Sequence, residues 1–437
     1  MNLHTTRAAS QNRQPCEAGA TRSTPREERA TAMRSAKRLL QNRFSRTAAV
    51  TAISLAMVLG LTSCTLDYTV GYVYVTTNQS NPGMIDQYTI DFYSGSLSQI
   101  GTPVAAGNDP IALVPSVNGR FVYVVNKLDS TVQEFAVQNN GSLVSQHVYP
   151  VTGTLPTAIT MDPQGAFLFV TFTYQPGYSA ATPGPGGVSI FPVNADYSLG
   201  TPTTQVVGNN PVGVTASYFN HFVYVLDQET QPNATVLGFS ENPSTGALTP
   251  VPGTTITTVA GKTVATGYAA GVMPSGIAEE PTARFVYVTD ELANQLIGYQ
   301  VLSSGALIAM VNGPFPTGLY PSNLTIDPTG RLIYVVNFNG STVQGYMIDG
   351  STGTPSGAVG AFATATGTGP TCVAIDPAEG IYLYTSDSQD ATVTGLQLNP
   401  NTGGLVGVQN SPFYASGSPS CLTIVPTGSH SSPTYIP

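Results

Sequence analysis

A short, strand-rich unit recurs along most of the chain. In the copy at residues 321–348, three apolar runs alternate with two turn clusters rich in Asp, Asn, Pro and Gly. Apolar runs bounded in this way are typical of antiparallel strands joined by hairpins. The copies are spaced 46, 55, 63, 47, 49 and 49 residues apart and begin at Pro110, Pro156, Pro211, Pro274, Pro321, Pro370 and Pro419. A period of this length, built only from strands, predicts a β-propeller with one four-stranded sheet per repeat.

The strands of the repeat are offset at the two ends of the chain. Seven innermost strands follow the seven prolines, and seven second strands centre on an aromatic residue, from Tyr74 to Tyr384. The second strand around Tyr74 has no innermost strand before it, and the last innermost strand, at 421–424, has no second strand after it. Pairing them removes two exposed sheet edges. We therefore predict an all-β, seven-bladed propeller of four antiparallel strands per blade, closed by the C-terminal strand, with residues 65–437 as one domain.

Charge divides the chain into two parts. Ten of the 15 Lys and Arg residues lie in residues 1–46, and the rest of the chain carries 5 basic and 21 acidic residues, a net charge of −16. A domain this acidic repels polyanions, so nucleic acid is excluded as a partner. The chain has neither a His or Cys cluster with metal-ligand spacing nor a phosphate-binding loop. We expect a monomer that uses no metal and no cofactor.

The N-terminal part has the pattern of an export signal. Residues 33–46 are basic and residues 48–61 are apolar, a run too short to span a bilayer comfortably. The run ends in Leu-Thr-Ser-Cys64, which resembles the bacterial lipobox and implies cleavage before Cys64 with a lipid on its thiol. The alternative is an ordinary signal peptide that happens to contain a cysteine. We predict a leader at residues 1–64 and an exported lipoprotein held at the membrane by its N-terminus.

Two further cysteines occupy equivalent places in successive repeats. Cys372 and Cys421 each lie two residues after the first proline of their repeat, where the other copies have mostly small residues. Neighbouring inner strands at this place can come close enough for a disulfide, and an oxidising compartment permits it. The sequence leaves two interpretations open, a Cys372–Cys421 bridge or two buried free thiols.

The second strands carry a recognisable motif. They read YVVN at 123–126 and 334–337 and YVTD at 287–290. These repeats resemble the YVTN type, and the set resembles the bacterial lactonase family of seven-bladed propellers. The resemblance implies lactone hydrolysis and makes Glu291, in Asp290-Glu291-Leu292, the candidate general acid or base. Where the family commonly has Pro-Arg-His, this chain has Pro274-Ser275-Gly276.

The expected ligand face is the end of the ring with the long loops. The two largest insertions, at 173–186 and 250–272, are both predicted to lie there. The insertions contain Tyr174, Tyr178 and Tyr268, and Tyr320 is predicted to lie nearby. We expect these four side chains to bind ligand, for example by stacking on a sugar ring. Lys127 and Asp290 are predicted to contribute charge to the same face. The Asn and Asp residues that end the second strands fit either a Ca²⁺ site or caps of turns.

The sequence predicts a function without naming a ligand. Because the cation and the imidazole of Pro-Arg-His are missing, we expect mainly a binding scaffold at the cell envelope, with a carbohydrate or an envelope protein as its partner. The alternative is a lactone hydrolase of the 6-phosphogluconolactonase-like family that acts on a non-phosphorylated sugar lactone. A purely structural envelope protein is the third interpretation.

Overall fold

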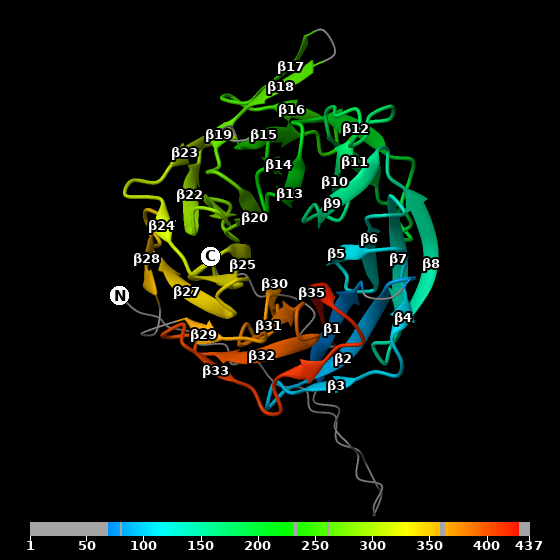
Figure 1. Cartoon of the computed structure of the whole chain (residues 1–437), viewed down its shortest axis with the longest axis vertical. Coiled ribbons are helices and arrows are strands. Elements are labelled where there is room, and N and C mark those ends of the chain that lie inside the picture. Colours follow the sequence, from blue (N-terminus) through cyan, green and yellow to red (C-terminus); the bar gives the residue numbers. More distant parts are fainter. Residues whose placement is uncertain (1–68, 79–80, 230–233, 260–261, 359–362, 428–437) are drawn as a thin grey trace, which may run out of the picture. The chain divides into compact units, whose positions relative to one another are not determined.

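The computed structural model of the chain describes residues 69–78, 81–229, 234–259, 262–358 and 363–427. The chain divides into two units, Met1–Asp67 and Tyr68–Pro437, and the described residues belong to the second. They form a closed ring of seven antiparallel sheets around a central channel, which Figure 1 shows along the ring axis. The predicted seven-bladed propeller is confirmed. The described residues contain no helix that is long and apolar enough to cross a membrane.

Each blade has four main strands, named here from the channel outward. The blades are numbered 1 to 7 by the order of their second strands along the chain, so the inner strand of blade 1 is the last one in the sequence. The innermost strands are β5 (Pro110–Pro115), β9 (Thr154–Met161), β13 (Pro211–Ala216), β20 (Pro274–Glu279), β25 (Pro321–Ile326), β30 (Pro370–Ile375) and β35 (Pro419–Pro426). The second strands are β1 (Thr69–Thr77), β6 (Phe121–Asn126), β10 (Phe167–Tyr174), β14 (Phe222–Asp227), β21 (Phe285–Asp290), β26 (Leu332–Asn337) and β31 (Tyr382–Asp387).

The outermost strand is short in most blades. The third strands are β2 (Met84–Asp91), β7 (Thr131–Val137), β11 (Gly187–Pro192), β15 (Thr235–Glu241), β22 (Gln295–Val301), β27 (Thr342–Ile348) and β32 (Thr392–Leu398). The outermost strands are β3 (Leu97–Gln99), β8 (Leu143–Pro150), β12 (Thr203–Val206), β16 (Leu248–Pro250), β23 (Leu307–Ala309), β28 (Pro355–Ala358) and β33 (Leu405–Gly407). In five blades the third strand also pairs with a further strand of two residues: β4 (Val104–Ala105), β19 (Tyr268–Ala269), β24 (Phe315–Pro316), β29 (Thr364–Ala365) and β34 (Phe413–Tyr414).

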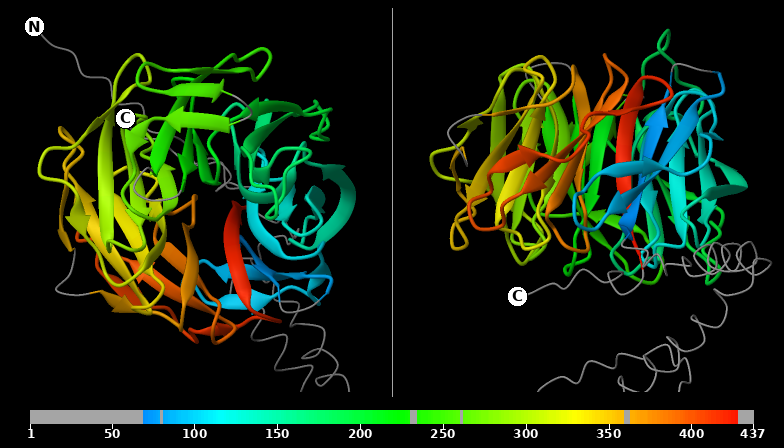
Figure 2. Two further views of the ribbon diagram at one scale, coloured as in Figure 1. Left: turned by 45° about the horizontal axis from the view of Figure 1, so that its top comes forward. Right: turned by 90° about the horizontal axis from the view of Figure 1, so that it is seen from below.

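The ring closes in blade 1, where the C-terminal strand β35 pairs with β1. Figure 2 shows this strand beside the N-terminal strands. Because β35 supplies the inner strand of blade 1, the inner edge of β1 is paired and not exposed. A disulfide between Cys372 and Cys421 joins β35 to the inner strand of blade 7, with the two Cα atoms 4.9 Å apart.

A ring of hydroxyl groups links the inner strands. In each blade the pairing of the innermost and second strands shifts at the residue after the first proline, which forms a β-bulge. In five blades this residue is Ser or Thr, and its hydroxyl donates to the carbonyl of the first proline in the next blade: Thr157, Ser275, Ser322, Thr371 and Ser420. In blade 4 the residue is Val212, and the Gln228 side chain donates to Pro274 instead, at 3.1 Å.

A second ring of contacts comes from the tyrosine of the repeat motif. In six blades its buried hydroxyl donates to a backbone carbonyl in the outer turn of the next blade, from Tyr74, Tyr123, Tyr224, Tyr287, Tyr334 and Tyr384. The seventh blade has Phe169 at this place and buries the ring without the hydrogen bond. These aromatic rings fill the space between blades and fix the order in which the sheets pack.

Close packing explains why glycine recurs in the Gly-x-x-Pro loop. The side chain that ends the second strand packs directly against this glycine, so that a Cβ on Gly208 would lie 1.6 Å from an Asp227 carboxylate oxygen. At Gly271 the φ angle is +88° and a Cβ would lie 2.1 Å from Asp290. Only glycine avoids both the collision and the backbone strain. The loop sequence therefore serves the packing of the polar cap at the end of each second strand.

The long insertion before blade 5 does not lie where the sequence analysis placed it. Its strands β17 (Thr255–Val259) and β18 (Lys262–Thr266) pair as a hairpin that projects outward from the rim of the ring (Figure 1). This part of the prediction of a single long-loop face is wrong. The insertion follows the outermost strand β16, and a hairpin that starts at the rim has no need to reach the channel.

Candidate functional site

Glu291 lies immediately after β21, at the end of the ring where the second and third strands are joined. Its backbone N–H donates to the Met273 carbonyl, 2.9 Å away, which fixes the residue against the loop that enters its own blade. The side chain is half-buried. Burial raises the pKa of the Glu291 carboxyl, and the charge of Asp290 raises it further, whereas a hydrogen bond from the Tyr320 hydroxyl lowers it. The site therefore holds a carboxylate that is more basic than one in water.

Tyr320 reaches Glu291 from the next blade. It has a φ angle of +59°, and its N–H donates to the Asn294 side chain, 2.7 Å away, so a polar contact holds this left-handed backbone. Its carbonyl accepts from the N–H of Phe338, at 2.8 Å, and the two rings lie 6.2 Å apart. The negative charge of Glu291 raises the pKa of Tyr320, which keeps the hydroxyl protonated and able to donate. Two residues predicted separately thus form one pair across the junction of blades 5 and 6.

Asp290 is held inside the fold by its own hydrogen bonds, and its role in ligand binding stays a prediction. The residue is completely buried. Its carboxylate accepts from the N–H groups of Val272 and Met273, at 2.8 and 2.9 Å, and from the Gln295 side chain, at 3.1 Å. The interpretation of these strand-end residues as caps therefore holds at this position. Among the described residues, no group of three or more His, Cys, Asp or Glu is arranged to hold a metal.

The tyrosines of the two insertions do not join Glu291 in one site. Tyr268 lies on β19 at the outer edge of blade 4, packs among apolar side chains and donates its hydroxyl to the Pro252 carbonyl. Its role in ligand binding stays a prediction. Tyr174 ends β10 opposite Thr154 in blade 3, and the Tyr178 ring packs against Gly184 of its own loop. Both rings are half-buried. Their role in binding stays a prediction.

Lys127 lies at the same end of the ring as Glu291 but on the other side of the channel. It follows β6 in blade 2, is half-buried, and its N–H donates to the Asp109 carbonyl at 2.9 Å. The described arginines lie in turns at the opposite end of the ring: Arg120, Arg284 and Arg331. Cys64 and the export signal lie outside the described residues.

The residues that replace Pro-Arg-His are fixed by packing. The Ser275 hydroxyl belongs to the hydroxyl ring and contacts the Pro321 carbonyl at 2.7 Å and the Thr289 hydroxyl at 2.8 Å. A Cβ on Gly276 would lie 3.0 Å from the same Thr289 oxygen. A larger side chain at residue 276 would therefore need its neighbours, Thr289 first, to move by a few tenths of an ångström.

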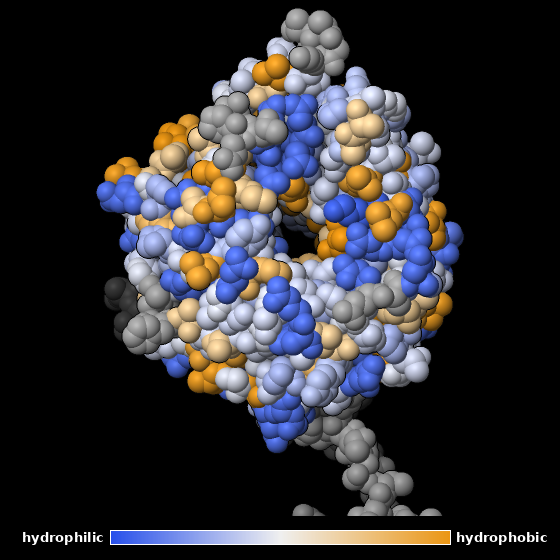
Figure 3. Space-filling view, in the orientation of Figure 1, coloured by the Kyte–Doolittle hydropathy of each residue, from blue (hydrophilic) through white to orange (hydrophobic). Residues whose placement is uncertain are grey.

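The sequence analysis missed a buried carboxyl at the other end of the channel. The channel widens there into a cavity of about 670 Å³ lined by the ends of the inner strands, among them Glu279, and Figure 3 shows the channel opening at the centre of the ring. Glu279 is 5% exposed and accepts from the Tyr218 N–H at 3.0 Å. Burial raises its pKa to about 7. The available signal was that Glu279 is charged at the end of an inner strand, where the other six repeats have Pro115, Met161, Ala216, Ile326, Ile375 and Ile424.

The family model of the lactonase seven-bladed β-propeller matches residues 72–221 and 220–375. The chain belongs to this family. A curated relative, the 6-phosphogluconolactonase of Bacillus subtilis (strain 168), is 24% identical over 240 residues, which are 53% of this chain and 62% of the relative. The match thus spans less than two thirds of that relative's length.

Solved structures share the fold of this lactonase-family propeller. The periplasmic gluconolactonase PpgL of Pseudomonas aeruginosa is 20% identical, with a TM-score of 0.65 over 82% of this chain and 99% of the other. A protein from Lactobacillus plantarum is 16% identical, with a TM-score of 0.63 over 82% and 99%. The prediction that the protein is mainly a binding scaffold is wrong, because family membership supports the alternative, a lactone hydrolase.

Proposed function

We propose that the protein hydrolyses a sugar lactone and that Glu291 is its general base. The observation that carries the proposal is the pairing of this half-buried, basic carboxylate with the protonated Tyr320 hydroxyl in a chain of the lactonase family. Glu291 takes a proton from water as the water oxygen bonds to the lactone carbonyl carbon. The ring C–O bond then breaks, and the proton passes to the leaving ring oxygen. Tyr320, whose single hydroxyl proton is directed at the Glu291 carboxylate, orients this base.

The substrate we propose carries no phosphate. Lys127 lies at this end of the ring but across the channel mouth from Glu291, in a domain whose sequence is strongly acidic. Exposed apolar side chains flank the pair instead, with Leu292 53% and Leu319 61% exposed. A phosphate dianion usually needs close cations, and this surface would repel it. A neutral lactone needs no nearby cation and is not repelled by the acidic surface.

The test is lactone hydrolysis by the purified chain with spontaneous hydrolysis subtracted. Glucono-1,5-lactone and 6-phosphoglucono-1,5-lactone are compared for the natural chain, Glu291→Gln and a matched control, Glu229→Gln, in which the carboxylate lies at the same end of blade 4. We expect faster turnover of the neutral lactone and a loss of about 10²-fold or more only in Glu291→Gln, the usual scale for a general base. Equal rates for all three chains would contradict the assignment of Glu291.

We also propose that the chain is exported and anchored through a lipid on Cys64. The basic and apolar segments before Cys64 support export, and the fold neighbour from Pseudomonas aeruginosa is described as periplasmic. Cys64→Ser should release the protein from the membrane fraction and abolish labelling with a fatty-acid probe. Retention of both properties in this variant would contradict the anchor.

A further inference from the structure

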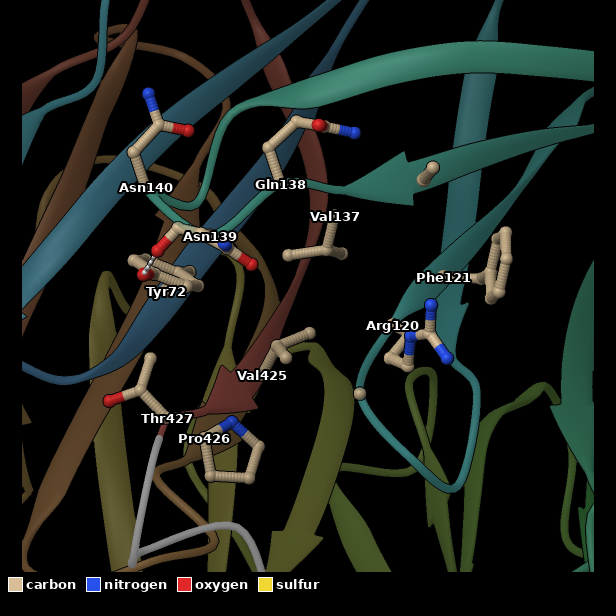
Figure 4. Close-up of a pocket in the computed structure, with 12 residues that line it drawn as sticks. Tyr72, Arg120, Phe121, Val137, Gln138, Asn139, Asn140, Val425, Pro426 and Thr427 are labelled. Atoms are coloured by element: carbon tan, nitrogen blue, oxygen red, sulfur yellow. Dashed lines mark hydrogen bonds between the residues drawn. The ribbon is translucent and has the colours of Figure 1, made fainter.

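An open pocket of about 850 Å³ lies where blades 1 and 2 meet, at the end of the ring opposite Glu291. It is formed by the turn between β5 and β6, the turn between β7 and β8, and the end of β35. Figure 4 shows Arg120 on one side of the pocket and Asn139 on the other. Val137, Val425 and Pro426 supply apolar surface between them. The pocket thus offers a cation, amide groups and an apolar wall within one space.

Arg120 differs from the arginines at the equivalent turns of other blades. The Arg284 guanidinium donates to the Gly350 carbonyl of the next blade at 2.7 Å, and that of Arg331 donates to Pro400 at 3.3 Å. Arg120 is exposed, and its guanidinium has no hydrogen bond or ion pair to any residue in the described part of the chain. In blade 3 the corresponding outer turn contains Tyr197, whose ring stacks on Phe121 at 5.6 Å. The guanidinium N–H groups of Arg120 can therefore donate hydrogen bonds to a ligand in the pocket.

The amide side chains of the pocket are held by a defined turn. The Tyr72 hydroxyl donates to the Asn139 carbonyl at 3.0 Å, and the Asn140 side chain accepts from the N–H of Ser142 at 3.1 Å. These contacts fix the backbone and leave the side-chain amides of Gln138 and Asn139 exposed, each with a donor and an acceptor. No carboxylate is among the lining residues, although the domain as a whole is acidic.

We propose that this pocket binds a sugar acid, a hydroxylated ligand with a single carboxylate. The planar guanidinium of Arg120 matches a carboxylate in a two-point contact, which a neutral sugar cannot provide. The Gln138 and Asn139 amides can exchange hydrogen bonds with hydroxyl groups, and the C–H face of the ligand packs on the apolar wall. One cation within an acidic domain suits a monoanion better than a phosphate dianion. This site is independent of Glu291 and of lactone hydrolysis.

Calorimetric titration of the purified chain with gluconate tests the proposal, with glucose and inorganic phosphate as separate arms. Arg120→Gln and Gln138→Ala should weaken gluconate binding about 10-fold or more, the former effect equivalent to one lost charge-assisted contact. Arg331→Gln is the matched control and should bind as the natural chain does. Glu291→Gln should retain the Arg120-dependent binding, which separates this pocket from the proposed active site. Both Arg side chains are exposed, so an unchanged melting temperature would show that the Arg120 variant is folded.

Three results would overturn the proposal. Gluconate binding that is unchanged in Arg120→Gln, or absent from the natural chain, would remove Arg120 as a ligand group. Glucose binding as tightly as gluconate would show that the carboxylate is not recognised. Phosphate binding as tightly as gluconate would show a general anion site instead of a site for sugar acids.

Discussion

Across the junction between blades 5 and 6, the Tyr320 hydroxyl lies close enough to the Glu291 carboxyl to lower its pKa, and the charge of Glu291 in turn raises the pKa of Tyr320. The two residues lie in different repeats, and each is fixed by backbone hydrogen bonds of its own, from Glu291 to Met273 and between Tyr320 and Asn294. The packing of blade 5 against blade 6 therefore sets the distance between the two side chains. Any change that loosens this junction should alter the basicity of Glu291 as well as its position.

The pH dependence of lactone hydrolysis should depend on Tyr320. A general base must be ionised, so activity should rise with pH through the raised pKa of Glu291. The hydrogen bond from Tyr320 lowers this pKa because it stabilises the ionised form. Tyr320→Phe should therefore move the acidic limb of the kcat/KM profile to higher pH, with the larger loss at low pH. Tyr174→Phe is the control and should leave the limb in place; an identical limb in both variants would contradict the contact.

The Cys372–Cys421 disulfide should stabilise the closed ring. It joins residues 49 positions apart and ties β35 to the blade that precedes it around the ring. Cross-linking a loop of this length is expected to contribute about 4 kcal/mol to the free energy of unfolding, mainly by restricting the unfolded chain. Urea denaturation of a Cys372→Ala, Cys421→Ala double variant measures the loss. Reductant should destabilise the natural chain and not the double variant, and equal sensitivity of the two chains would exclude the bridge.

The hydroxyl ring should contribute separately at each of the five blade junctions where it forms. Ser322→Ala removes the bond from its hydroxyl to the Pro370 carbonyl, 2.7 Å away, and should cost about 1 kcal/mol of unfolding free energy. Ser356→Ala is the matched control, because this exposed serine bonds only within its own blade, to Met347 at 3.3 Å. Chemical denaturation measures the loss of unfolding free energy in each variant. A loss in Ser356→Ala as large as that in Ser322→Ala would show that the ring has no special role.

The fold could be predicted because its determinants are local and repeated. The apolar runs, the turn residues and the first proline recur in every copy, and the offset of strands at the two ends was enough to predict the pairing of β35 with β1. The roles of individual polar residues were harder to predict. Asp290 and Glu291 are adjacent in sequence, yet one is completely buried as a cap and the other is half-buried beside Tyr320. Which of two neighbours faces the backbone and which faces the next blade depends on strand register and on loops from another repeat.

The predicted position of the second insertion was wrong for a similar reason. Its length and its tyrosine suggested a binding loop, but length alone does not say whether a segment extends over a face or away from the rim. The β17–β18 hairpin pairs with itself, and Tyr268 packs against β15. The pocket at Arg120 gave no signal in the sequence either, because its special property is a contact that the equivalent arginines make and Arg120 does not.

The protein should be less stable at pH 8 than at pH 5. Burial raises the pKa of Glu279 and of Glu241 to about 7, and that of Asp227 and of Asp387 to about 6. Between their ordinary and raised pKa values the folded chain keeps these protons while the unfolded chain releases them. The free energy of unfolding therefore falls as pH rises, from about pH 4 until about pH 7, and stays low above it.

Glu279→Gln should remove one part of this decline. A glutamine can still accept from the Tyr218 N–H at this buried position, and it carries no charge at any pH. We expect stability equal to the natural chain at pH 5 and higher by on the order of 2 kcal/mol at pH 8, since each unit of pKa shift corresponds to about 1.4 kcal/mol. Denaturation at both pH values measures this. The control is Asp349→Asn, a fully exposed turn residue whose pKa is lowered by hydrogen bonds from Thr352, so its profile should run parallel to that of the natural chain. A parallel profile for Glu279→Gln as well would show that Glu279 is already ionised in the folded protein at neutral pH, at no cost to its stability.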